Sequence, residues 1–166
     1  MKQQLNDLIV EILKKNETLV SIAIKQRAKF EGWLKFELAS RLVNYYSDLE
    51  VEYPYPNKTN QHADIFANGA LIELKTPNTN FKTEQCKSCT RPITKNISSI
   101  IEDINKLRKV DGSCKKYIAF VLFPIDSEGK YNVYIERIEK EGYTHLLCKS
   151  IDIYNIPVLV CTAEVS

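Results

Sequence analysis

Three charged side chains lie close to a tight turn, and their spacing is suited to holding a metal ion. Asp64 and Glu73 flank the pair Asn68-Gly69, and Lys75 follows Glu73 by two residues. Asn-Gly is the preferred pair for a type I′ β-hairpin turn, because both central residues take positive φ angles. A two-residue turn here predicts a register in which Asp64 lies opposite Glu73.

The predicted register brings two carboxylates together on one face of the hairpin. Side chains alternate in direction along a strand, so Asp64, Glu73 and Lys75 should share a face. Directly opposed like charges destabilise a sheet, whereas a hard divalent cation prefers carboxylate oxygens as ligands. A metal-bound water can attack a phosphodiester, and Lys75 could orient or help to deprotonate that water, or stabilise the transition state. The alternative is a solvated Asp64 beside a surface Glu73–Lys75 ion pair.

The elements around the hairpin predict one α/β (α+β) domain over residues 1–166, with a central mixed sheet flanked by helices. Hydrophobic periodicity, turn residues and prolines define the segments. The predicted helices are 5–13, 19–24, 26–46 and 93–110, and the predicted strands are 49–53, 63–67, 70–76, 117–123, 131–138, 145–149 and 157–161. No linker divides the chain, so we expect a core at about 26–123, an N-terminal helical extension over 1–25 and C-terminal strands within 124–166.

Asp64, followed nine residues later by Glu73-Leu74-Lys75, resembles the signature of the PD-(D/E)XK nuclease superfamily. Ala63 stands where that signature has proline, and the predicted order over the core is the αβββαβ of the restriction-endonuclease-like fold. The resemblance implies phosphodiester hydrolysis that depends on Mg²⁺, with Mn²⁺ as a substitute, and DNA as the substrate. It implies that Asp64, Glu73 and the backbone carbonyl of Leu74 bind the metal, and that Lys75 is the catalytic lysine.

Many members of this superfamily also bring an acidic residue from the first core helix to the metal. Glu37 lies among apolar residues that should face the sheet, and a carboxylate there needs a partner, either the metal or Arg41 one turn on. Glu31 has Lys35 at i+4, the usual arrangement of a solvated helix pair. We therefore expect Glu37 to complete the catalytic and metal-binding set, with Glu31 as the alternative.

Several other residues are weaker candidates. Cys86 and Cys89 have the spacing of half a zinc site, but no second such pair is present, and an ordinary loop is the preferred interpretation. His62 lies two residues before Asp64 and could reach the same face. A set of basic residues near the predicted site could track phosphates or form a solvated surface: Lys82, Lys87, Arg91, Lys95, Lys106, Arg108 and Lys109.

Composition limits the classes of protein to which the chain can belong. Apolar residues make up 44% of the 166 residues, and 23 basic against 21 acidic residues give no overall charge that favours nucleic acid. No segment is apolar and long enough to span a membrane, and no signal peptide is recognisable. With an odd number of cysteines, five, we expect a reduced cytoplasmic protein with free thiols.

The leading hypothesis is a Mg²⁺-dependent endonuclease acting on DNA, of a restriction-like, repair or junction-resolving kind. A homodimer would let two sites address both strands, an expectation taken from the habit of the family. The first alternative is a catalytically inactive module on the same fold that binds nucleic acid or protein. The second is a zinc-stabilised interaction domain that uses Cys86 and Cys89.

Overall fold

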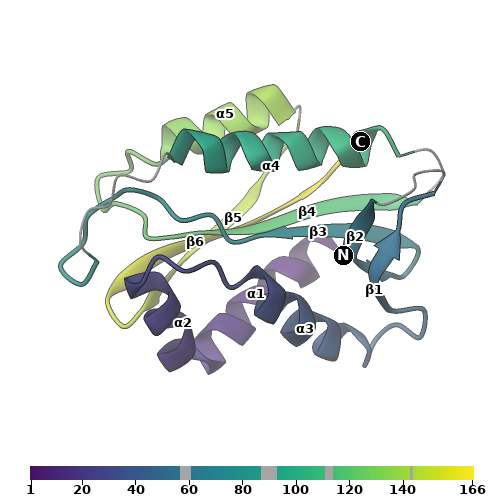
Figure 1. Ribbon diagram of the computed structural model, residues 1–166, viewed down its shortest axis with the longest axis horizontal. Helices are drawn as coiled ribbons and strands as arrows, with labels where there is room; N and C mark the ends of the chain where they lie inside the picture. The colour runs from purple at the N-terminus through teal and green to yellow at the C-terminus, as the bar shows by residue number, and fades with distance from the viewer. Residues whose placement is uncertain (57–60, 87–92, 111–113, 143) are drawn as a thin grey trace.

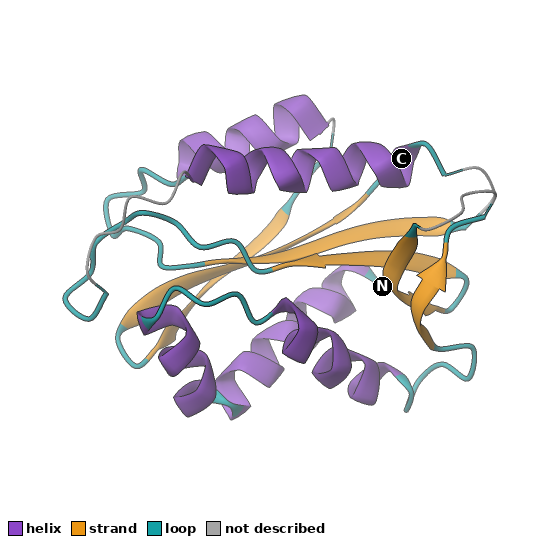
Figure 2. Cartoon of the chain, in the orientation of Figure 1, coloured by secondary structure: helices purple, strands orange, loops and turns teal. Residues whose placement is uncertain are grey.

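A six-stranded mixed sheet lies between two layers of helices in the computed structural model, which describes residues 1–56, 61–86, 93–110, 114–142 and 144–166 (Figure 1). Helices α1 (Lys2–Lys15), α2 (Glu17–Lys25) and α3 (Glu31–Leu42) cover one face, and α4 (Ile93–Arg108) and α5 (Asn132–Gly142) cover the other (Figure 2). The strands are β1 (Glu50–Pro54), β2 (His62–Ala67), β3 (Ala70–Lys75), β4 (Lys115–Leu122), β5 (Leu147–Ile153) and β6 (Ile156–Glu164). This arrangement confirms the predicted mixed sheet flanked by helices.

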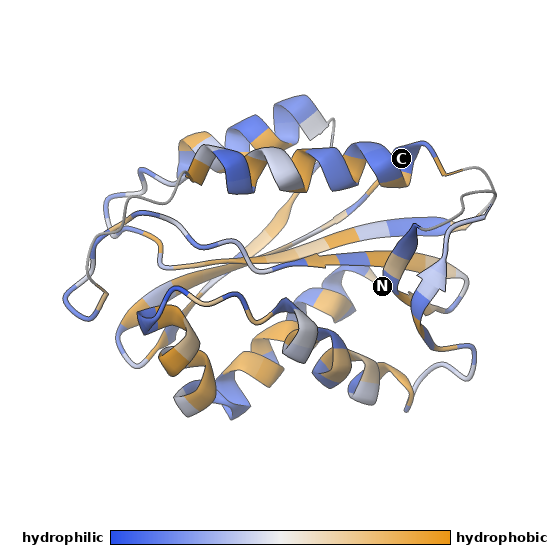
Figure 3. Ribbon diagram, viewed as in Figure 1, coloured by the Kyte–Doolittle hydropathy of each residue, from blue (hydrophilic) through white to orange (hydrophobic). Residues whose placement is uncertain are grey.

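The sheet is apolar on both faces because both are covered, and the central strands are largely hydrophobic (Figure 3). Ile72 points into the core beneath α1–α3, whereas its neighbour Leu71 points into the core beneath α4 and α5. The strand order is β1-β2-β3-β4-β6-β5. Strand β4 runs parallel to β3, and every other neighbouring pair is antiparallel. From α3 to β4 the elements follow the predicted order αβββαβ.

The hairpin between β2 and β3 has the predicted turn. Asn68 and Gly69 both have positive φ, 53° and 65°, and the register pairs Ala67 with Ala70. The carboxylate of Asp48 accepts hydrogen bonds from the backbone N–H groups of Asn68 (2.8 Å) and Gly69 (2.9 Å). These bonds lower the pKa of Asp48, since they stabilise its charged form.

The segment 131–138 was predicted to be a strand, and this is wrong, because residues 132–138 belong to helix α5. Tyr131, Tyr134, Ile135 and Ile138 have the i, i+3, i+4, i+7 spacing of a helix and pack into the core beneath α4. Val133, which a strand would have turned inward with Tyr131 and Ile135, is 60% exposed. The apolar residues fit both periods over this short stretch, and packing on α4 selects the helical one.

Other predicted boundaries shift. Helix α3 covers only Glu31–Leu42 of the predicted 26–46. Its start is later than predicted because Arg27 has a positive φ of 56° and its buried side chain donates to the carbonyls of Thr79 and Phe81. Strands β5 and β6 are longer than the predicted 145–149 and 157–161. They are joined by a tight turn at Tyr154 and Asn155, which both have positive φ.

The expectation that all cysteines are free thiols is wrong for one pair. Cys148 and Cys161 lie directly opposite each other in β5 and β6 and form a disulfide. Cys86 and Cys114 are free, and Cys86 is fully buried. Cys89 lies outside the described residues, so the alternative of a zinc site at Cys86 and Cys89 stays a hypothesis.

Candidate active site

A cavity of about 280 Å³ lies beside β3, next to the β2–β3 hairpin, and all three residues of the predicted centre line it. Asp64 comes from β2, and Glu73 and Lys75 come from β3. The remaining lining residues are Tyr55, Gln61, His62, Asp103 and Lys106. His62, a weaker candidate from the sequence, therefore also borders this cavity.

Asp64 does not pair with Glu73 in the way that the hairpin register predicted. The ladder between β2 and β3 ends at the pair Ile65–Ile72. Beyond it, the carboxylate of Asp64 accepts a hydrogen bond from the backbone N–H of Leu74 at 2.8 Å. This side-chain bond takes the place of the next backbone pairing between β2 and β3. It holds the carboxylate of Asp64 against the backbone of β3.

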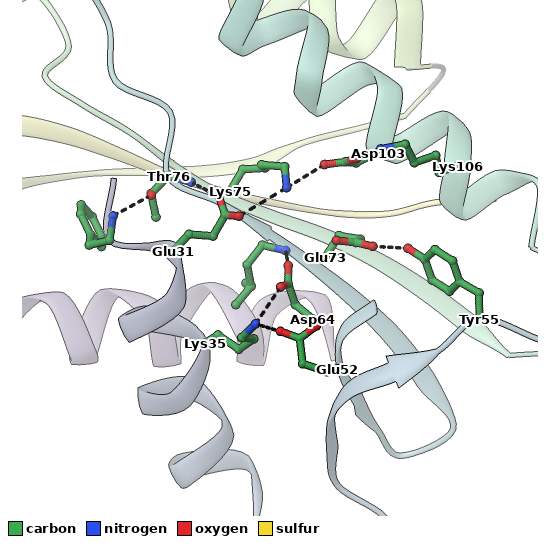
Figure 4. A network of polar contacts seen from close by, with 12 residues as sticks. Glu31, Lys35, Glu52, Tyr55, Asp64, Glu73, Lys75, Thr76, Asp103 and Lys106 are labelled. Atoms are coloured by element: carbon green, nitrogen blue, oxygen red, sulfur yellow. Dashed lines mark hydrogen bonds and ion pairs between the residues drawn. The ribbon is translucent and has the colours of Figure 1, made fainter. Parts of the chain in front are cut away.

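Helix α3 supplies a lysine to Asp64. The ammonium of Lys35 donates to Oδ1 of Asp64 at 3.4 Å and also to the carboxylate of Glu52 (Figure 4). Burial disfavours the charged Lys35, but the bonds and charges of Glu52 and Asp64 outweigh this and raise its pKa. Lys35 was predicted to form a solvated pair with Glu31, and the structure instead turns it toward the hairpin.

Glu73 is the most perturbed acid of the cavity. It is only 8% exposed, and the hydroxyl of Tyr55 donates a hydrogen bond to its carboxylate. The pKa of Glu73 is raised to about 8, mainly by burial. The charges of Asp64 and Asp103 also raise it, whereas the Tyr55 hydrogen bond and the charge of Lys75 lower it. The same burial, together with the charge of Glu73, raises the pKa of Tyr55. Added positive charge near Glu73 would favour its charged form and lower its pKa.

Two helices on opposite faces of the sheet hold Lys75. Its ammonium lies 2.9 Å from Oδ2 of Asp103 on α4 and 3.4 Å from Oε1 of Glu31 on α3 (Figure 4). Burial lowers the pKa of Lys75, but the hydrogen bond to Asp103 and the charges of Glu31, Asp103 and Glu73 outweigh it and raise that pKa. Glu31 also accepts a hydrogen bond from the N–H of Thr76 at 3.2 Å, which fixes its position.

In the structure, Glu31 and not Glu37 contacts Lys75, the residue predicted to be the catalytic lysine. Glu37 lies further along α3, does not line the cavity, and its backbone carbonyl accepts a bond from Ser40. The alternative Glu37–Arg41 pair is also not formed, because Arg41 pairs with Glu11 at 3.6 Å. Six residues on a helix correspond to about 240° of rotation, so the two glutamates face different sides of α3.

Sequence reasoning missed Asp103, Lys35 and Tyr55. Asp103 had a usable signal, because it lies three residues after Ile100 and four before Leu107, on the buried stripe of α4. A carboxylate on such a stripe requires a partner. Lys35 and Tyr55 had no comparable signal, since their partners come from other elements.

Two of the predicted basic residues have different partners in the structure. Lys106 lines the cavity and lies 2.7 Å from Oδ1 of Asp103. Arg108 donates to the backbone carbonyls of Ser166 and Gly142 instead, which ties α4 to the C-terminus and to α5. Lys87 and Arg91 lie outside the described residues.

Searches against models of protein families, against curated proteins and against solved structures find no match for this chain. Among the residues that the structure describes, no helix combines the length and the apolar character that a membrane span requires.

Proposed function

We propose that this chain is a Mg²⁺-dependent endonuclease of the restriction-endonuclease-like fold that hydrolyses phosphodiester bonds in DNA. The observation that carries the proposal is the convergence of Asp64, Glu73 and Lys75 on one cavity. The element order αβββαβ from α3 to β4 also supports the proposal, because it is the order expected for the restriction-endonuclease-like fold. In this order the hairpin lies between α3 and α4 along the chain.

The donor set of the cavity suits Mg²⁺. Within the described part of the chain, no three His, Cys, Asp or Glu side chains are grouped to hold a metal. Mg²⁺ does not need such a cage, because it keeps several waters and binds through one or two carboxylates. Asp64 and Glu73 are the proposed ligands, with the backbone carbonyl of Leu74. Burial is the main cause that raises the pKa of Glu73, the charges of Asp64 and Asp103 raise it as well, and a bound cation would favour the charged form of Glu73.

When bound, Mg²⁺ would supply an activated water and stabilise charge on the scissile phosphate. Of the roles considered for Lys75, a fixed positive charge agrees best with its surroundings. Its contacts with Asp103 and Glu31 raise its pKa, so it stays protonated at neutral pH and cannot accept a proton. Lys75 then orients the attacking water or stabilises negative charge in the transition state.

The test is cleavage of plasmid and branched DNA in Mg²⁺ or Mn²⁺, with RNA assayed in parallel. Asp64→Asn and Lys75→Met should each lower kcat by about 10²–10³-fold, the usual loss when one electrostatic contact to a transition state is removed. Lys149→Met removes an exposed lysine that pairs with Asp7 on α1 and should leave the rate unchanged.

Metal-dependent cleavage that survives Lys75→Met would contradict the proposal. Binding of DNA without cleavage of any substrate would favour the inactive binding module, and cleavage of RNA alone would overturn the choice of DNA. The expectation of a homodimer is tested separately, by measuring the molar mass of the protein with and without DNA.

A further inference from the structure

Lys35 is a buried cation that the proposed reaction does not use. Its residue is only 9% exposed, and its ammonium is held between the carboxylates of Asp64 and Glu52 (Figure 4). A buried lysine needs such partners, because an unpaired charge is costly to remove from water. The unusual feature is that one partner, Asp64, is a proposed ligand of the metal.

Both oxygens of Asp64 are already engaged. Oδ2 accepts from the N–H of Leu74 at 2.8 Å, and Oδ1 faces the ammonium of Lys35 at 3.4 Å. The amide bond fixes the orientation of the carboxylate and carries no net charge. Lys35 does carry a full charge, so a divalent cation that binds Asp64 meets direct repulsion from it.

Glu52 is a second carboxylate partner for Lys35. The side chain of Glu52 is 59% exposed, and its backbone has a positive φ of 52° on the edge strand β1. The paired positions Val51–Ile65 and Tyr53–Ala63 enclose Glu52 and Asp64 in the register of β1 and β2, so the two acids are neighbours. Lys35 can therefore release Asp64 while it keeps its bond to Glu52.

We propose that Lys35 and the divalent cation compete for the carboxylate of Asp64, and that Glu52 holds Lys35 when the cation binds. Lys35 then sets the metal concentration at which the site fills. This inference rests on the proposed function, because it requires a cation at Asp64.

The experiment is calorimetric titration of the full chain with Mn²⁺ alone, without DNA. Lys35→Met should bind Mn²⁺ about tenfold more tightly or better than the natural protein, because the competing charge is gone. Lys106→Met is the matched control: it removes a lysine charge that lines the cavity, but Lys106 pairs with Asp103 rather than with Asp64. Its effect should be much smaller.

Glu52→Gln distinguishes competition from general electrostatics. It should weaken Mn²⁺ binding in the natural protein, because Lys35 is then left with Asp64 alone. In the Lys35→Met background, the same change should have no effect. A weakening of equal size in both backgrounds would mean that Glu52 acts only through its own charge, and it would overturn the proposed exchange.

The outcomes separate this inference from the function beneath it. If Asp64→Asn abolishes Mn²⁺ binding but Lys35→Met leaves the affinity unchanged, the competition is refuted and the proposed metal site stands. If neither the natural protein nor Lys35→Met binds Mn²⁺, both fail. Lys35→Gln repeats the test with a polar side chain should Lys35→Met not fold, and the rise in Tm on adding Mn²⁺ should then exceed that of the natural protein.

Discussion

Glu73 couples the electrostatics of the cavity to the stability of the protein. Its pKa is about 8 in the folded chain, against an ordinary value of 4.5. Between these values the folded state keeps a proton on Glu73 that the unfolded state has lost. The free energy of unfolding therefore falls as the pH rises through this window. The stabilising contribution of protonated Glu73 is fully present only below about pH 4.5.

We predict that Glu73→Gln flattens this dependence. With a metal chelator present, the free energy of unfolding of the natural protein should fall between pH 5 and pH 8. Its fall should be steeper than that of the variant by on the order of 1 kcal/mol per pH unit. Urea unfolding at several pH values measures the difference. Glu102→Gln, at an exposed position on α4, is the control and should keep the natural slope. Equal slopes in all three proteins would show that Glu73 ionises normally.

Asp103 is the residue through which α4 contacts Lys75. It is 5% exposed and lies 2.9 Å from the ammonium of Lys75. Asp103→Asn keeps the shape but removes the charge that holds Lys75, so we predict a fall in kcat of about tenfold or more with little change in KM. In a Lys75→Met background the same substitution should cost much less, because the two residues act as a pair. Additive losses would assign Asp103 a separate role.

At the scale of elements, the β2–β3 hairpin depends on its turn. Gly69 has a φ of 65°, and a Cβ added there would meet no atom within 4 Å. Gly69→Ala should therefore cost only the backbone penalty of the left-handed conformation, about 1–2 kcal/mol of unfolding free energy. Gly32→Ala is the matched control, because it also meets no atom within 4 Å but lies in helix α3, where alanine should stabilise by about 0.5–1 kcal/mol. Urea unfolding measures the free energy of both variants. A loss of stability in Gly32→Ala would show that backbone conformation does not decide the effect of an added Cβ at these two open positions.

Elements with a local signal could be predicted from the sequence. Asn68-Gly69 defined the hairpin, and the apolar stripe of α4 defined that helix. Helix α5 was missed because residues 131–138 satisfy both periods, and only the contact with α4 decides between them. Candidate residues divide in the same way. The turn predicted that Asp64, Glu73 and Lys75 lie near one another, but it did not predict the bond from the Leu74 N–H to Asp64. The partners of Lys35 depend on how α3 packs against β1 and β2.

At the scale of the whole molecule, the two ends of the chain form one structure. Helix α1 packs beneath β5 and β6, and the buried Asn6 donates to the carbonyls of Leu147 (3.1 Å) and Val160 (3.2 Å). The same apolar core includes Leu34 and Leu38 of α3, which also carries Glu31 and Lys35. The segment 1–25 therefore shares an apolar core with α3, the helix that carries Glu31 and Lys35.

This shared core predicts that a cavity in α1 destabilises the candidate site as well. Ile9 is fully buried, so Ile9→Ala should lower the unfolding free energy by about 2–5 kcal/mol. Ile22→Ala on α2 is the control, since Ile22 is 53% exposed and its loss should cost less than about 0.5 kcal/mol. The single tryptophan, Trp33, lies on α3, and its fluorescence should report the same transition as circular dichroism. If Trp33 unfolds at unchanged urea concentration while the helical signal shifts, α1 and α3 belong to separate cooperative units, and the dependence of the site on the N-terminal helix is disproved.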